Sequence, residues 1–153
     1  MIKFIHNPEA TVVGDNVEQF LRWLAGPSCI VLGGQDNSRC RAVVTLLHGN
    51  EPSGSMALFK WLKEKHQAHT KTIFIIVSVE TALTPPLFHY RTLPDQLDIN
   101  RCFRPPFDSK QGQLAKAILE VLDHYSPEAL IDIHNTSGSG PAFGVATHQD
   151  KVH

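Results

Sequence analysis

Three residues in two short segments have the types and spacing of metal ligands. His48 and Glu51 lie in the segment His-Gly-Asn-Glu, and His134 lies in the later segment Asp-Ile-His-Asn-Thr. A catalytic zinc ion takes three protein ligands from imidazole nitrogens and carboxylate oxygens, and it leaves a fourth position for water or substrate. The sequence therefore predicts a site for one zinc ion, with metal-assisted hydrolysis as its chemistry.

The first ligand segment is predicted to be a tight turn between a strand and a helix. The apolar residues 42–47 indicate a buried strand before it, and residues 52–63, which begin with Pro52, indicate a helix after it. Gly49 and Asn50 both tolerate positive φ angles, so we expect them to reverse the backbone and bring the two ligands to one point.

The second ligand segment ends a predicted strand over residues 129–134. Asp132 and His134 share one face of that strand, because alternate residues of a strand point the same way. We therefore expect Asp132 to orient His134 by hydrogen bonding, and the alternative is that its carboxylate faces a neighbouring strand. Both ligand segments then lie at the carboxyl ends of strands, where open α/β sheets bind their ligands.

Three motifs in order support a family resemblance. They are residues 48–51, the segment Asp-Ile-Asn-Arg-Cys-Phe at residues 98–103, and residues 132–136. Together they resemble the succinylglutamate desuccinylase and aspartoacylase family, which is related to the zinc carboxypeptidases. The resemblance implies a zinc-dependent amidohydrolase, a deacylase that cleaves the amide bond of an N-acyl amino acid, with one zinc ion as cofactor and that small molecule as partner.

The resemblance also implies roles position by position, beginning with the three zinc ligands named above. Asn100 and Arg101 match a pair that holds a substrate carboxylate, and a guanidinium fork suits this task. Arg91 is the candidate for the arginine that polarises the scissile carbonyl. Asp98 is expected to orient neighbouring groups by hydrogen bonds, and Asn135 to finish the wall of the substrate site. An ordinary surface position for either arginine, and a simple turn at Asn135, are the alternatives.

The sequence offers no clear general base. Hydrolysis of this kind needs a group that takes a proton from the metal-bound water. The resembling family uses a glutamate that follows the last zinc ligand, whereas this chain has none after Glu128. His148 or Asp150 could be proposed as a substitute, but their spacing does not support either. Glu51 is already used as a ligand.

Family members are longer and carry a second, mostly β region. We therefore expect residues 1–153 to be one zinc-hydrolase-like α/β domain that lacks a C-terminal region and is inactive alone. The alternatives are a non-catalytic zinc- or ligand-binding fragment and a zinc carboxypeptidase. The expected fold is an incomplete three-layer α/β/α sandwich of the zinc carboxypeptidase type, with a mixed, largely parallel sheet.

The periodicity of the rest of the chain supports an α/β fold. Further helices are predicted over residues 16–25, with Asp15 as N-cap, and 109–125, and further strands over 28–32 and 72–79. Residues 81–107 hold five of the ten prolines, and we expect an ordered substrate-binding loop there.

Composition narrows the classes of partner and location. The chain has 14 basic and 15 acidic residues with no basic cluster, which argues against nucleic acid as a partner. It has no apolar stretch of membrane-spanning length and no signal-peptide core, so we expect a cytoplasmic protein without a membrane partner. The three scattered cysteines are expected to be reduced. Assembly into a homo-oligomer is left open.

Overall fold

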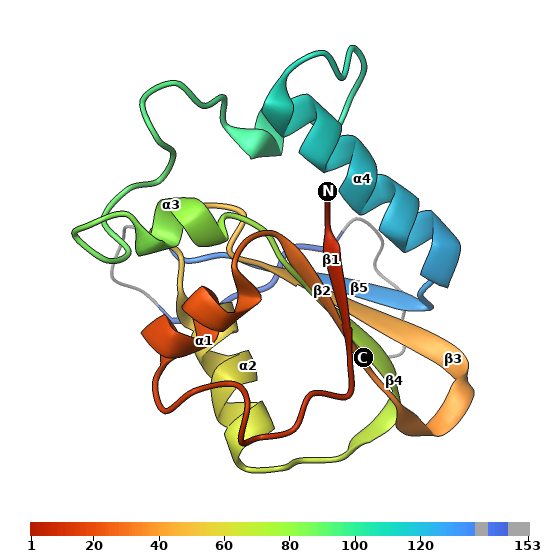
Figure 1. Cartoon of the computed structure of the whole chain (residues 1–153). Coiled ribbons are helices and arrows are strands. Elements are labelled where there is room, and N and C mark those ends of the chain that lie inside the picture. The colour runs from red at the N-terminus through yellow and green to blue at the C-terminus, as the bar shows by residue number, and fades with distance from the viewer. Residues whose placement is uncertain (137–140, 147–153) are drawn as a thin grey trace.

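The computed structural model describes residues 1–136 and 141–146 and has an α/β architecture (Figure 1). Its strands are β1 (Lys3–His6), β2 (Ser28–Leu32), β3 (Gly34–Thr45), β4 (Ala68–Ile76) and β5 (Ala129–Ile133). Its helices are α1 (Val17–Leu24), α2 (Ser53–Lys63), α3 (Val79–Leu83) and α4 (Lys110–Tyr125), with a short 3-10 helix at Ile99–Arg101.

The strands form one mixed, five-stranded sheet in the order β1-β2-β4-β3-β5. The pairs β1–β2, β3–β4 and β3–β5 are parallel, and β2–β4 is antiparallel. The prediction of a mixed, largely parallel sheet is therefore confirmed. Because β3 and β5 are parallel neighbours, their carboxyl ends lie side by side at one edge of the sheet, and the chain segments that follow them start there.

Helices cover both faces of this sheet, as Figure 1 shows. Ile73 and Ile75 of the central strand β4 belong to an apolar cluster with Ala115, Ile118 and Val121 of α4. The alternate residues of β4 face the opposite way and pack with α1, α2 and α3; this second cluster contains Phe74, Ile76, Phe20, Leu21, Leu58, Val79 and Ala82. Residues 73–76 of β4 are all buried, as suits a strand that is covered on both faces.

Several predicted boundaries were wrong. The N-cap of α1 is Asn16, whose side chain accepts a hydrogen bond from the Gln19 N–H at 2.9 Å, and not Asp15. Asp15 instead donates its own N–H to the Gln19 side chain at 2.9 Å, which completes a reciprocal cap. The segment expected to be loop from residue 81 contains the end of α3 and the 3-10 helix. Strands β3 and β4 both start and end earlier in the chain than the predicted strands over residues 42–47 and 72–79.

The cysteines are reduced, as predicted: Cys29, Cys40 and Cys102 are all buried and free. Burial, with a smaller contribution from the neighbouring Cys40, raises the pKa of the Cys29 thiol to about 12, so this side chain is a neutral core residue. Among the described residues, no helix is both long enough and apolar enough to cross a membrane.

Candidate metal centre

The turn after β3 carries the first two candidate ligands, but its backbone reverses by a different route from the one predicted. Neither Gly49 nor Asn50 has a positive φ; the left-handed residue of this turn is the buried Leu46, at φ 56°. The Glu51 N–H donates to the His48 carbonyl at 3.1 Å, which closes the turn just before α2. The prediction failed because it treated glycine only as a source of positive φ.

Gly49 is required for space instead. A Cβ atom at this position would lie 2.6 Å from Thr81 Cγ2 and 2.7 Å from the Tyr90 carbonyl oxygen. The Gly49 N–H also donates to the Arg91 carbonyl at 3.0 Å. The absence of a side chain therefore lets the segment around Arg91 lie directly against the ligand turn.

The three predicted ligands converge. His48, Glu51 and His134 each offer one ligand atom, and these atoms all lie within 4.8 Å of one another. Glu51 joins the two rings, since its Oε1 lies 2.9 Å from His48 Nδ1 and its Oε2 lies 2.7 Å from His134 Nδ1. His48 and Glu51 are buried, whereas the side chain of His134 is 32% exposed, so the group is open on the His134 side. Two imidazole nitrogens and one carboxylate form a donor set that fits a divalent metal ion.

Each histidine is also oriented by an aspartate on its other nitrogen. His48 Nε2 lies 2.9 Å from Asp98 Oδ1, and His134 Nε2 lies 2.8 Å from Asp132 Oδ2. Both rings therefore direct Nδ1 toward Glu51. This pairing of ligand histidine and carboxylate is typical of protein metal sites, where it fixes the ring and raises its basicity.

The aspartates and histidines shift one another's proton affinity. Burial alone would raise the pKa of Asp98, but hydrogen bonds from His48, the Asn100 N–H and Arg91 outweigh it and lower this pKa to about 2. Burial likewise favours neutral His134, yet its hydrogen bonds to Asp132 and Glu51 outweigh burial and raise its pKa. The cluster thus favours ionised carboxylates beside a protonated ring.

Arg91 lies at this cluster, although its side chain is 49% exposed. Its guanidinium donates from Nη1 to Glu51 Oε1 at 3.1 Å and from Nη2 to Asp98 Oδ2 at 3.2 Å. It therefore bridges a candidate ligand and the aspartate that orients the other ligand of the turn. This places a cation beside Glu51 and Asp98, the two groups that are paired with His48.

Asn100 and Arg101 lie close to the cluster in sequence, because Asp98 caps the 3-10 helix that contains them. Asp98 Oδ1 accepts from the Asn100 N–H at 2.9 Å. Both side chains are exposed, and within residues 1–136 and 141–146 neither forms a hydrogen bond or ion pair. Their donors are thus free to bind a ligand.

Asn135 is already engaged. Its Oδ1 accepts from the Ser53 N–H at 3.2 Å and from the Ser53 hydroxyl at 2.9 Å, and its own N–H donates to Glu51 Oε2 at 3.3 Å. Ser53 was not among the site residues predicted from the sequence. A signal was present, however, because Pro52 precedes Ser53 and has no side chain that can cap the helix.

No described carboxylate near the cluster is free to act as a general base. The carboxylates of Glu51, Asp98 and Asp132 are each hydrogen-bonded to a histidine ring nitrogen. Glu128 precedes β5, at the end of the strand opposite His134, and pairs with Arg41 at 3.0 Å. The other two candidates, His148 and Asp150, lie outside the described residues.

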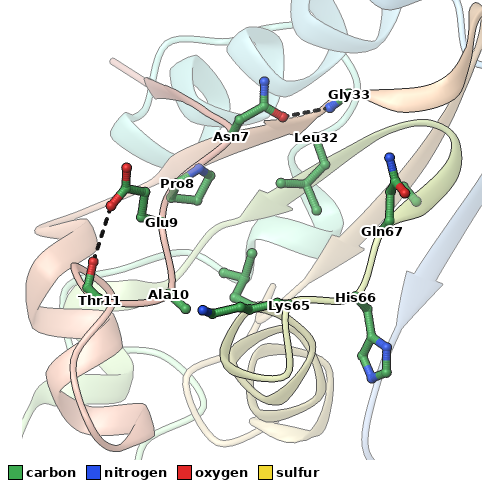
Figure 2. Close-up of a pocket in the computed structure, with 12 residues that line it drawn as sticks. Asn7, Pro8, Glu9, Ala10, Thr11, Leu32, Gly33, Lys65, His66 and Gln67 are labelled. Atoms are coloured by element: carbon green, nitrogen blue, oxygen red, sulfur yellow. Dashed lines mark hydrogen bonds between the residues drawn. The ribbon is translucent and has the colours of Figure 1, made fainter.

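A hollow on the surface lies away from this cluster. It has a volume of about 460 Å³ and lies where β2 ends and β4 begins, which is the end of the sheet away from the metal ligands. Figure 2 shows its wall, where the Asn7 side-chain oxygen accepts a hydrogen bond from the Gly33 N–H and the Glu9 carboxylate accepts one from the Thr11 hydroxyl. None of the predicted site residues lines it. Titratable groups converge instead at His48, Glu51 and His134.

Comparisons with known proteins neither add to this assignment nor oppose it. No protein-family model, no curated protein and no solved structure matches the chain.

Proposed function

We propose that this chain is a zinc-dependent amidohydrolase acting on N-acyl amino acids, similar to the succinylglutamate desuccinylase and aspartoacylase family. The observation that carries the proposal is the convergence of His48, Glu51 and His134, each histidine being held by an aspartate on its second nitrogen. Zinc is the metal that best fits two imidazoles and one carboxylate with an open fourth position. The proposal includes a sheet and helix arrangement of the zinc carboxypeptidase type.

The residues around the ligands suit the binding of a small acylated amino acid. A zinc ion held by these ligands would activate a water molecule and polarise a carbonyl group. Arg91 can donate to the carbonyl oxygen of the scissile amide, because its guanidinium already lies against Glu51. Arg101 and Asn100, whose side chains are exposed and unpaired among the described residues, can hold the carboxylate of the amino acid.

A second candidate function is metal binding without catalysis. It is favoured by one observation: every described carboxylate at the cluster is committed to a histidine nitrogen. Loss of a general base typically costs about 10² to 10⁴ in rate. If the described groups are all that act here, the chain binds zinc and turns over substrate slowly or not at all.

Zinc content and hydrolysis, measured on the same preparation, test these proposals. We expect about one zinc ion per chain, and slow release of free amino acid from N-acetylaspartate or N-succinylglutamate that disappears in His134→Ala. Zinc binding with no release above the buffer rate would favour the non-catalytic function. Release of C-terminal residues from peptides instead would indicate a carboxypeptidase. A chain that binds no zinc would overturn all three.

A further inference from the structure

The strand that presents His134 is poorly buried. Among the strands of the described residues, β5 lies at an edge of the sheet and pairs with β3 alone, and its apolar residues Leu130 and Ile131 are 50% and 60% exposed. Core packing therefore does little to fix where this strand ends. A ligand carried on it needs another restraint to stay within bonding distance of the other two ligands.

Helix α2 supplies that restraint through a contact that joins two distant parts of the chain. Ser53, the first residue of α2, donates its N–H and its hydroxyl to Asn135 Oδ1 at 3.2 and 2.9 Å. Two donors from one residue identify this side-chain atom as the amide oxygen. The contact also satisfies one of the N–H groups that a helix leaves unpaired at its start, which Pro52 cannot do.

The same residue reaches the ligand set through its backbone. The Asn135 N–H donates to Glu51 Oε2 at 3.3 Å, the oxygen that also lies 2.7 Å from His134 Nδ1. Asn135 therefore fixes its neighbour His134 from both sides, through Ser53 and through Glu51. These contacts hold the third ligand against the first two.

Gly54 lets α2 approach close enough for this contact. A Cβ atom at position 54 would collide with the hydroxyl of Thr45, the last residue of β3, and would lie 3.2 Å from Cβ of Ile133, the last residue of β5. The start of α2 is thus pressed against the ends of the two strands that precede the ligand segments. Small residues directly after Glu51 make this fit possible.

We propose that Ser53 and Asn135 are positioning residues, and that their side-chain contact sets the distance of His134 from His48 and Glu51. This role differs from the substrate contact expected for Asn135 from the sequence. The inference rests in part on the proposed zinc site, because its main effect is on metal affinity. Its second effect, on the order of the β5 end, does not require a metal.

The test compares full-length variants that break the contact with variants that keep it. Asn135→Leu removes the acceptor, and Ser53→Ala removes the hydroxyl donor. Ser53→Thr keeps the hydroxyl. Thr84→Ala is a matched control, because it removes an exposed 2.9 Å hydroxyl contact in another part of the chain. Zinc affinity is measured by competition with a fluorescent chelator, and backbone amide exchange of residues 129–135 is measured on protein stripped of metal.

We expect Asn135→Leu to weaken zinc binding about 10- to 100-fold, the usual effect of losing a group that orients metal ligands, and Ser53→Ala to weaken it less. Exchange of residues 129–135 should accelerate in the same order. Ser53→Thr and Thr84→Ala should match the wild type. If Asn135→Leu does not fold, the comparison of zinc affinity between Ser53→Ala and Ser53→Thr tests the positioning role.

The outcomes separate this inference from the proposed function. Wild-type zinc affinity in both disrupting variants would overturn the positioning role, even if amide exchange changed. A wild-type chain that binds no zinc would overturn the proposed function. In that case unchanged exchange in the variants would also overturn the inference, whereas faster exchange would support the placement of β5 by Ser53 and Asn135.

Discussion

Zinc binding to this chain should release protons, because the candidate ligand rings are paired at the nitrogens that a metal ion would take. Each of the two histidine rings has both nitrogens within 2.9 Å of a carboxylate oxygen. Ionised carboxylates only accept hydrogen bonds, so both pairs of His134 are filled only when its ring carries two N–H groups, as the raised pKa of His134 favours. A metal ion that takes Nδ1 of this ring must displace the proton there.

The charges of the cluster favour a divalent metal ion. Glu51, Asp98 and Asp132 supply three negative charges, and Arg91 supplies one positive charge. One zinc ion with two neutral rings brings the sum to zero, which avoids the cost of burying an uncompensated charge in this partly buried group.

The size of the effect on zinc affinity follows from the displacement of protons. Each displaced proton makes zinc affinity rise about tenfold per pH unit, or about 1.4 kcal/mol, so one to two protons give about 10- to 100-fold. Because the pKa of His134 is raised, the rise should continue above the ordinary imidazole range before it levels off. By the same linkage, the stability that His134 gives the metal-free protein is complete below the ordinary imidazole pKa and is lost as pH rises through the folded value.

Isothermal titration near pH 6, in buffers with different ionisation heats, measures the protons released, and chelator competition measures affinity from about pH 5.5 to 8. We expect protons to be released on zinc binding at the lower pH, and fewer as the pH rises above the raised pKa of His134. In Asp132→Asn the acceptor beside His134 loses its charge, so the pH dependence should move to lower pH. Zinc binding with no proton release and a flat affinity over this range would refute the reasoning.

Three further predictions follow from particular contacts. Gly54→Ala should destabilise the protein by about 1 to 3 kcal/mol in urea unfolding, because the added Cβ has no room beside Thr45. Gly33→Ala is the control and should be nearly neutral, since the nearest atom to its added Cβ would lie at 3.6 Å. Equal effects of the two substitutions would contradict the close approach of α2. Arg101→Lys should raise KM for an N-acyl amino acid about tenfold and leave zinc affinity unchanged, and an unchanged KM would show that another group holds the carboxylate. Asp98→Asn should be less stable than the wild type at neutral pH, and the difference should vanish as pH falls through about 2; a constant difference in acid unfolding would contradict the low pKa of Asp98.

The convergence of the candidate ligands could be predicted in part, because their signals in the sequence are local. An apolar strand followed by His48 and Glu51, and a strand followed by His134, place both groups at carboxyl ends of strands by pattern alone. The pairing of β3 with β5, which brings these ends together, is a long-range fact that the sequence does not state. Asp132 was predicted as the partner of His134 because alternation along a strand places them on one face, and their side chains meet at 2.8 Å.

The turn itself shows where local rules fail. Glycine was read as a residue that permits positive φ, and the structure uses Gly49 to admit the backbone of Tyr90 and the side chain of Thr81. The positive φ falls on Leu46 instead, a bulky residue that is rarely found in this conformation. The favourable burial of Leu46 in the core beneath α2 offsets that cost, and burial depends on the whole fold.

The contact between Ser53 and Asn135 joins residues 82 positions apart, so no periodicity or motif spacing encodes it. The need for such a contact is nevertheless local. A helix that begins after Pro52 has no capping side chain of its own, and its first N–H groups must find an acceptor elsewhere. The acceptor found here belongs to the residue directly after His134. The requirement to cap α2 and the requirement to bring the third ligand to the first two are therefore met by the same side chain.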